Sequence, residues 1–352
     1  LAPRIEAPGQ FVAVLLGAED HVDRCIEQVP DLTLPEVPDG RVFVVNWMVG
    51  DGTDDGGPWM RLCDPSMPYL DRDRFGAVGQ QHDGDALAGI EGVLDQQRVP
   101  GMERVELADD QATAANTNDL RGKILRIKPE ADGTYSIPDG NLFPKGTPRT
   151  RPEIYTMGSR NPYRFSVDMK NGFVYFGDVG PDTKVPSPGG TLSYDEVNQV
   201  RKPGFFGWPY FIGDNQAYRD YDFDREKSGP AFDPEMPIND SPNNTGARVL
   251  PPARPAIIWY PYQPSPLFPM LGTGGRSAMA GPVFRFDPRR TGPGGLPADF
   301  DGSLFAFDFM RHWIQEVRFD DAGEMVSVEP FLPEMTLVRP MAMDVGPDGA
   351  LY

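Results

Sequence analysis

Short runs in which apolar and polar residues alternate recur along this chain, each directly after a turn that contains glycine. They lie at residues 39–45, 171–176, 301–307 and 347–352. An Asp-Gly or Asn-Gly pair before a run with a period of two is a strong signal for a β-hairpin. Two further runs, residues 313–319 and 324–328, flank an Asp-Asp-Ala-Gly turn and predict a second hairpin. The pattern therefore predicts strands at these positions, with residues 85–97 as the best candidate for a short surface helix.

The repetition of paired strands indicates a β-propeller. Two strands joined by a tight turn make half of a four-stranded blade, and blades of about 40–50 residues repeated around an axis form a propeller. The copies here are irregularly spaced, so the pattern alone predicts an all-β domain, with a two-sheet sandwich as the alternative to a propeller. The segment 214–276 interrupts the repeats and is rich in Pro, Asn and Asp. Its interleaved aromatic residues predict an ordered excursion that packs over the sheets.

The composition agrees with a folded protein that has many turns. Glycine and proline number 39 each among 352 residues, about 22% together, against roughly 12% in average proteins. Acidic residues outnumber basic residues by 52 to 33, and the formal net charge is -19. Because a field of this sign repels phosphate backbones and anionic lipids, the charge argues against binding to nucleic acid or to a membrane surface. It is compatible with calcium ligation and with neutral substrates such as sugars.

The cysteines and the chain ends give little information about function. Cys25 and Cys63 form one disulfide or none, and no CxxC pair or paired histidine accompanies them in a zinc-binding spacing. No apolar run approaches the roughly 20 residues that a membrane-spanning helix needs. The sequence begins at Leu1 without a methionine or a signal peptide and ends inside an apparent strand at Leu351-Tyr352. We therefore expect a propeller that is cut at both ends.

Four short motifs follow one another between residues 160 and 209. They are Arg160-Asn161-Pro162, Gly177-Asp178-Val179-Gly180-Pro181-Asp182, Asp195-Glu196-Val197-Asn198 and Gly207-Trp208-Pro209. Gly180-Pro181 follows a predicted strand and Asp178, and its two carbonyl groups suit either calcium binding beside a carboxylate or an ordinary turn. The rigid guanidinium of Arg160 suits either a bound carboxylate or the anchoring of a loop.

In this order and spacing, the four motifs resemble the glucose/sorbosone dehydrogenase family, β-propeller quinoproteins that oxidise sugars with pyrroloquinoline quinone (PQQ). The resemblance implies a single six-bladed propeller domain over residues 1–352. Residues 1–115 are expected to form divergent N-terminal blades, and residues 116–352 the family-like blades with the excursion at 214–276.

At the positions that match the family motifs, the resemblance assigns roles to individual residues. It implies that Arg160 and Asn161 contact PQQ, and that the carbonyl groups of Gly180 and Pro181 bind the calcium ion that clamps PQQ. Residues 309–314 match a segment with a cofactor-binding Lys-Arg pair, in which Met310 stands at the lysine position and Arg311 follows. Arg339 falls where another cofactor-facing arginine is found.

Other matching segments carry fold information only. Residues 117–127 match a family segment that ends in a predicted strand with its apolar residues pointing inward. In the last two motifs we expect structural roles, at turns and between blades, for Glu196, Asn198 and Trp208.

The catalytic base of such an enzyme is missing from its expected position. Oxidation of a sugar at its anomeric carbon by hydride transfer needs a base for the hydroxyl proton, and histidine is the natural choice near neutral pH. The family segment that carries this histidine aligns with Cys25-Ile26, so that Ile26 stands at its position. His21 and His82 remain as weak candidates, and for His312 we expect a structural role.

Three functional hypotheses follow. The leading one is a PQQ- and calcium-dependent dehydrogenase of the aldose type, with a sugar substrate, an electron acceptor such as a cytochrome or a quinone, and a periplasmic or secreted location implied by the resemblance. The alternative is a non-catalytic propeller that binds carbohydrate or a protein partner, since a fold does not fix a function. The third is a calcium-dependent propeller of the lactonase type, for which Asp178, Asp182 and Asp195 are available as ligands.

Overall fold

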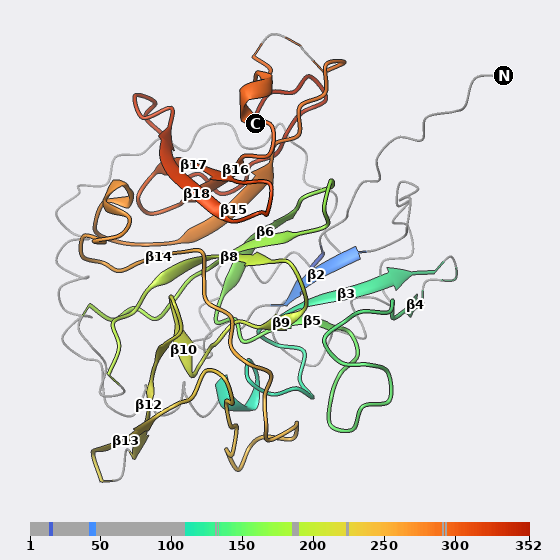
Figure 1. The fold of residues 1–352 in the computed structure, drawn as a ribbon, viewed down its shortest axis with the longest axis vertical. Helices are drawn as coiled ribbons and strands as arrows, with labels where there is room; N and C mark the ends of the chain where they lie inside the picture. Colours follow the sequence, from blue (N-terminus) through green and yellow to red (C-terminus); the bar gives the residue numbers. More distant parts are fainter. Residues whose placement is uncertain are drawn as a thin grey trace, which may run out of the picture. The chain divides into compact units, whose positions relative to one another are not determined.

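The computed structural model describes residues 14–16, 42–46 and 110–352, apart from residues 131, 133, 185–189, 223–224, 291 and 293. Within these residues, nearly all regular structure is β-sheet (Figure 1). The helical elements are one turn at residues 110–112 and the 3-10 turns η3 (Pro269–Leu271) and η4 (Ala298–Phe300). The prediction of an all-β fold is confirmed. The short helix predicted at residues 85–97 and both cysteines lie outside the described residues.

One sheet is an antiparallel meander of four strands that follow one another in the sequence. They are β15 (Ala278–Val283), β16 (Leu304–Asp308), β17 (Trp313–Phe319) and β18 (Met325–Phe331). The strands β16, β17 and β18 coincide with the predicted runs at residues 301–307, 313–319 and 324–328. In β16, Leu304 and Ala306 pack into one buried cluster, whereas Phe305 and Phe307 pack into another. Because successive side chains of a strand point to opposite faces, both faces of this sheet are covered.

A second sheet also has four antiparallel strands in chain order. They are β6 (Pro162–Val167), β7 (Val174–Asp178), β8 (Asp195–Val200) and β14 (Ile258–Tyr260). The alternating run at residues 171–176 becomes the turn before β7 and the start of that strand. β14 comes from the segment 214–276, in which the sequence pattern predicted no strand, and it pairs with β8 from Ile258 opposite Val197 to Tyr260 opposite Asp195.

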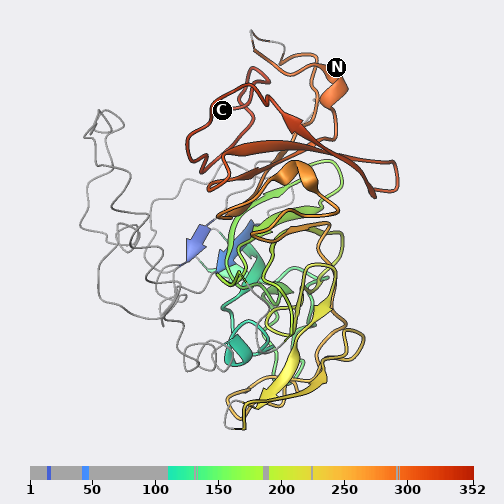
Figure 2. The same ribbon diagram turned by 90° about the vertical axis from the view of Figure 1, so that its left-hand side faces the viewer.

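These two sheets pack against each other through β15, which contacts β6 and β7 (Figures 1 and 2). Tyr175 of β7, Ala278 of β15 and Val317 of β17 belong to one buried hydrophobic cluster. Two neighbouring four-stranded meanders are the arrangement of adjacent propeller blades. The structure therefore supports the propeller prediction, while the count of six blades stays a prediction.

The third sheet contains the early part of the described chain. Its order is β1 (Val14–Leu16), β2 (Val42–Asn46), β3 (Lys123–Pro129), β5 (Ile154–Met157) and β9 (Gly204–Phe205), with β4 (Tyr135–Ser136) paired to β3. β2 and β3 match the predicted runs at 39–45 and 117–127. Two short ribbons complete the fold: β10 (Phe211–Ile212) with β11 (Gln216–Ala217), and β12 (Arg219–Asp222) with β13 (Lys227–Ala231).

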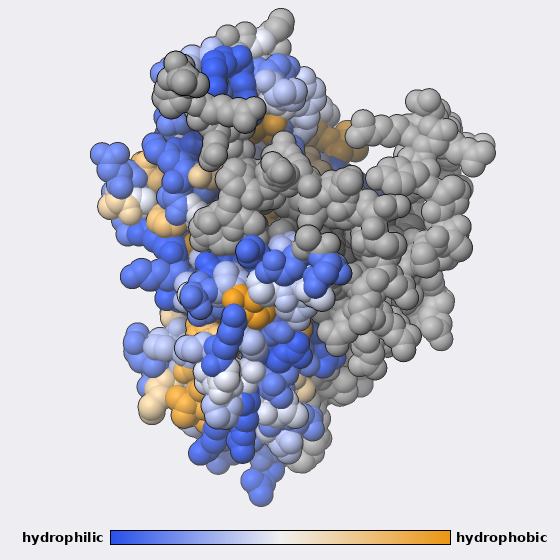
Figure 3. Space-filling model, turned by 90° about the vertical axis from the view of Figure 1, so that its right-hand side faces the viewer, coloured by the Kyte–Doolittle hydropathy of each residue, from blue (hydrophilic) through white to orange (hydrophobic). Residues whose placement is uncertain are grey.

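The described surface in Figure 3 is mostly hydrophilic. In Figure 3, hydrophilic side chains dominate the visible described face and hydrophobic ones form small separate patches. Among the described residues, no helix is long and apolar enough to span a membrane.

Candidate functional site

The carboxylate of Asp178, at the end of β7, holds the backbone of the Arg160-Asn161 motif. Its two oxygens accept the backbone N–H of Arg160 at 3.0 Å and of Asn161 at 2.6 Å. The N–H of Val179 in turn donates to the Asn161 carbonyl at 3.1 Å. Two motifs that lie 17 or 18 residues apart in the sequence therefore form one structural unit. The sequence offered a signal for this link, since Asp178 stands between the predicted strand and the Gly180-Pro181 turn.

The side chain of Arg160 points to the same turn. Its Nη1 donates to the carbonyl oxygens of Val179 and Gly180, both at 3.2 Å. The guanidinium also lies 5.9 Å from the ring centre of Trp208. A small recess beside it is lined by Arg160, Asp178, Gly180, Tyr194, Glu196, Phe206, Trp208, Phe211 and Ile212. The recess thus combines one cation, two buried carboxyl groups and an apolar wall.

The Gly180-Pro181 turn is fixed by the first residue of β8 and by the two residues before it. The N–H of Gly180 donates to Oδ1 of Asp195 at 3.2 Å. A Cβ atom at position 180 would overlap with the carbonyl oxygen of Tyr194, so glycine is required here by the close approach of the two backbones. The hydroxyl of Ser193 donates to the Pro181 carbonyl.

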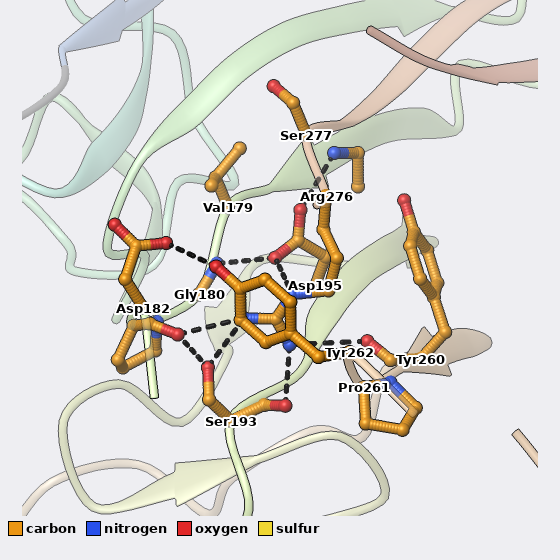
Figure 4. Close-up of polar contacts among 12 residues, drawn as sticks. Val179, Gly180, Asp182, Ser193, Asp195, Tyr260, Pro261, Tyr262, Arg276 and Ser277 are labelled. Carbon is orange, nitrogen blue, oxygen red and sulfur yellow. Dashed lines mark hydrogen bonds and ion pairs between the residues drawn. The ribbon is translucent and has the colours of Figure 1, made fainter. Parts of the chain in front are cut away.

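Arg276, in the segment before β15, lies at the centre of this polar network (Figure 4). Its Nη2 donates to the Pro181 carbonyl at 2.8 Å and to Oγ of Ser193 at 2.7 Å. Its Nη1 donates to the Ser193 carbonyl at 2.5 Å and, more weakly, to the Tyr260 carbonyl at 3.4 Å. Its Nε lies 3.3 Å from Oδ1 of Asp195, and the two side chains are 1% and 0% exposed.

The ring of Tyr262 covers this guanidinium. The Cζ atom of Arg276 lies 4.1 Å from the ring centre, and the Tyr262 hydroxyl donates to Oδ1 of Asp182 at 2.8 Å. The turn, β8, the end of β14 and the approach to β15 are therefore joined by a single buried cation. Sequence reasoning missed Arg276, because an isolated arginine in a glycine-rich segment carries no motif of its own.

Burial changes the acidity of three carboxyl groups at this site. It raises the pKa of Asp178 to about 6, although the N–H groups of Asn161 and Arg160 act in the opposite direction. Burial raises the pKa of Asp195 to about 7 against the effect of Arg276. Burial, together with the nearby Asp178, raises the pKa of Glu196 to about 8. Burial and the neighbouring Asp178 therefore favour the protonated form of Glu196 in this recess.

Glu196 and Trp208 also have the structural roles that the sequence suggested. Oε1 of Glu196 accepts the backbone N–H of Gly213 at 2.5 Å, and its Oε2 accepts Nδ2 of Asn198 at 3.0 Å. Trp208 is buried and stacks edge-on against Tyr218, with ring centres 6.0 Å apart.

The predicted cofactor residue Arg311 lies in a second polar cluster around Asp308. Oδ1 of Asp308 accepts the N–H of Met310 at 2.7 Å and of Arg311 at 2.6 Å, and its Oδ2 accepts the Tyr260 hydroxyl at 2.6 Å. The guanidinium of Arg311 donates to five backbone carbonyls, those of Pro261, Leu271, Gly272, Gly274 and Gly275. Since a guanidinium has five N–H groups, Arg311 anchors the loop around η3 with its whole donor set.

The remaining predicted residues lie apart from the turn or outside the described chain. Arg339 is exposed and stacks on Phe309, 5.6 Å from the ring centre. Met310 is 44% exposed. His312 forms the β16–β17 turn by donating its N–H to the Asp308 carbonyl at 3.0 Å, and its side chain is exposed. His312 thus contributes to the turn through its backbone N–H and not through its imidazole. Ile26, His21 and His82 lie outside the described residues.

The donor set at the Gly180-Pro181 turn does not fit a calcium ion. Both carbonyls accept hydrogen bonds from guanidinium groups, Gly180 from Arg160 and Pro181 from Arg276. Among the described residues, no three His, Cys, Asp or Glu side chains gather closely enough to hold a metal. Calcium prefers six to eight oxygen ligands and would lie next to two positive charges here.

Arg160 and Trp208 present a cation and an aromatic ring on one small recess, and a guanidinium is a suitable partner for a carboxylate. The guanidinium donors of Arg311 are all used in bonds to backbone carbonyls in this structure. The cofactor roles of Arg160, Asn161, Arg311 and Arg339 stay predictions.

Comparison with known families decides the relationship for the central part of the chain. The family model for glucose/sorbosone dehydrogenase matches residues 103–247. This segment is similar in sequence to the glucose/sorbosone dehydrogenase family. The family resemblance seen in the sequence is confirmed, and the matched segment contains the Arg160-Asn161 motif, the Gly180-Pro181 turn and β8. Arg276 and Arg311 lie beyond it.

Curated proteins with similar sequences include two from Arabidopsis thaliana. HIPL2 of Arabidopsis thaliana is 32% identical over 166 residues, which are 44% of this chain and 20% of HIPL2. HIPL1 of the same plant is 31% identical over 144 residues, 37% of this chain and 19% of HIPL1. The chain thus spans about a fifth of the length of these relatives.

Among solved structures, similar chains include a glucose dehydrogenase-type oxidoreductase of Thermus thermophilus, with 23% identity and a TM-score of 0.41 over 70% of this chain and 53% of that one. The soluble aldose sugar dehydrogenase of Escherichia coli in its apo form has 18% identity and a TM-score of 0.40, over 68% of this chain and 52% of that one.

Proposed function

We propose that this chain is a sugar oxidoreductase of the quinoprotein type, which oxidises an aldose or a related sugar with PQQ as the acceptor. The observation that carries the proposal is the position of Arg160 and Asn161. Both lie inside the glucose/sorbosone dehydrogenase segment and are fixed by Asp178 beside the Gly180-Pro181 turn. A functional motif whose backbone is held by a buried carboxylate is preorganised for ligand binding.

The residues of the recess have distinct parts in this proposal. The guanidinium of Arg160 would hold a carboxylate of the cofactor. PQQ, when bound, supplies the two-electron acceptor for hydride removal from the sugar. The apolar side chains of Phe206, Phe211 and Ile212 exclude water from this side of the site. His21 and His82 remain the candidates for the base that accepts the proton of the sugar hydroxyl.

Calcium, which the sequence also predicted, has no support from the donor set at the turn. The proposal further places the protein in the periplasm or outside the cell, with a cytochrome or a quinone as the final electron acceptor. These parts of the proposal rest on the family resemblance.

A titration of the purified protein with PQQ tests the proposed function, with the quinone absorbance and tryptophan fluorescence as signals and with parallel samples in calcium and in EDTA. We expect saturable binding, and a bleaching of the quinone absorbance when an aldose is added. The substitution Arg160→Met should weaken PQQ binding at least about tenfold, because a charge-assisted hydrogen bond contributes about 1.5–3 kcal/mol.

The matched control is Arg248→Met, which removes an exposed guanidinium whose nearest acidic partner, Asp240, is 3.7 Å away. It should leave PQQ binding unchanged. If neither calcium nor EDTA samples bind PQQ, the dehydrogenase proposal fails. The non-catalytic propeller that binds carbohydrate or a protein partner then becomes the better interpretation.

A further inference from the structure

The guanidinium of Arg276 lies in a cage of oxygen atoms. Its neighbours are the carbonyl oxygens of Pro181, Ser193 and Tyr260, the hydroxyl of Ser193 and Oδ1 of Asp195, at 2.8, 2.5, 3.4, 2.7 and 3.3 Å (Figure 4). Neutral carbonyl and hydroxyl oxygens with one carboxylate are the ligand types of a hard divalent cation. In this protein, a side chain of the chain itself supplies the positive charge.

Burial leaves no room for a second cation in this cage. Arg276 is 1% exposed and Asp195 is 0% exposed, and the ring of Tyr262 closes the remaining side 4.1 Å from the guanidinium carbon. The second oxygen of Asp195 is already used, since it accepts the N–H of Ala278 at 2.9 Å. A calcium ion at the Pro181 carbonyl would therefore have to displace Arg276 and leave its charge buried without a partner, which is strongly unfavourable.

We propose that Arg276 is a resident cation that takes the place of a metal ion at the Gly180-Pro181 turn, so that this turn is ordered without calcium. The guanidinium bridges three parts of the chain that a metal ion would otherwise join, namely the turn, the start of β8 and the end of β14. The inference concerns the unliganded protein and stands whether or not the protein oxidises sugars.

The proposal makes opposite predictions for the wild type and for a variant that lacks the cation. The substitution Arg276→Ala leaves the cage oxygens without a positive charge, and their chemistry then suits calcium. We expect the melting temperature of R276A to fall below that of the wild type and to rise again by about 3 °C in calcium at about ten times its dissociation constant, but not in magnesium. The wild type should show no calcium-dependent shift.

The measurement is thermal unfolding followed by tryptophan fluorescence, at the same pH for the wild type and for every variant. The conservative variant R276K keeps a positive charge in the cage and should not respond to calcium. The double variant R276A/D195N loses the only carboxylate among the cage oxygens named above, and it should lose the calcium response of R276A.

Three results would overturn the proposal. The first is a calcium-dependent rise in the melting temperature of the wild type as large as that of R276A. The second is a folded R276A variant that does not respond to calcium, and the third is a response that persists in the double variant. If R276A does not fold, the proposal is tested with the wild type and R276K. The absence of a calcium-dependent shift in both melting temperatures supports a resident cation, and a shift in both refutes it.

Failure here is distinguishable from failure of the proposed function. A wild type that responds to calcium and also binds PQQ would refute the resident cation and leave the proposed function standing. A wild type that ignores calcium and does not bind PQQ would refute the proposed function and leave the resident cation standing.

Discussion

Replacement of Glu196 by glutamine should make the protein more stable at alkaline pH and leave its stability almost unchanged at acid pH. Glu196 is 6% exposed and lies opposite Asp178 in the β7–β8 pairing. Burial and the negative charge of Asp178 raise its pKa from 4.5 to about 8. Between these two pH values, the folded protein keeps a proton that the unfolded chain releases.

The sign of the effect follows from proton binding. Because the folded state binds more protons, the free energy of unfolding decreases as the pH rises from 4.5 towards 8. The contribution of Glu196 is complete below the unfolded pKa and is lost above the folded one. The difference between the two pKa values corresponds to a loss of about 5 kcal/mol in the free energy of unfolding. About 3 kcal/mol of this loss occurs between about pH 5.5 and about pH 8.5.

Glutamine can occupy this position with little loss of hydrogen bonding. Its oxygen can accept the N–H of Gly213, as Oε1 of Glu196 does. Its amide nitrogen would face Asn198, whose Oδ1 has no hydrogen-bond partner among the described residues and can turn to accept. The substitution therefore removes the titrating group and keeps the packing.

The assay is urea unfolding at constant ionic strength, repeated across this pH range for wild type and E196Q. We expect the two proteins to be similar near pH 5.5 and E196Q to exceed the wild type by about 3 kcal/mol near pH 8.5. Glu334→Gln, at an exposed position, is the matched control and should follow the wild type. A constant difference between E196Q and wild type at every pH would refute the reasoning.

Three further substitutions test the packing around the site by urea unfolding. Lys123→Met should cost about 3 kcal/mol, because the buried ammonium donates to three backbone carbonyls that would lose their partner; an unchanged midpoint would contradict this. Tyr260→Phe should cost about 1–3 kcal/mol through the loss of its 2.6 Å bond to a buried carboxylate, and a gain in stability would show that this bond is not needed. Gly158→Ala should cost about 2 kcal/mol or more, since Gly158 has a φ of +80° and a Cβ there would overlap with the Phe205 ring. Gly146→Ala, with a φ of +81° and open space, is its control, and equal losses would argue against the overlap.

The strands of this protein that the sequence predicted have local signals, whereas the predicted run at residues 347–352 forms only an isolated bridge between Val345 and Leu351. The runs at 301–307, 313–319 and 324–328 match β16 to β18, and their tight turns set the pairing of neighbouring strands. β14 was not predictable. It pairs with β8 although more than fifty residues separate them, and its three residues are too few for a period to be seen.

Part of the candidate site was likewise predictable from local sequence, and part of it depends on long-range contacts. The sequence determined that Arg160-Asn161 and Gly180-Pro181 are special, because these residue types occur together in a short, ordered stretch. It also determined that Asp178 lies next to the turn. The occupant of the turn was decided by tertiary structure alone. Arg276 reaches the Pro181 carbonyl over a sequence separation of 95 residues, and only the packing of β15 beside β7 and β8 brings the guanidinium there. A sequence motif can thus specify a ring of oxygen acceptors, whereas the identity of the cation depends on long-range contacts, which short sequence patterns do not encode.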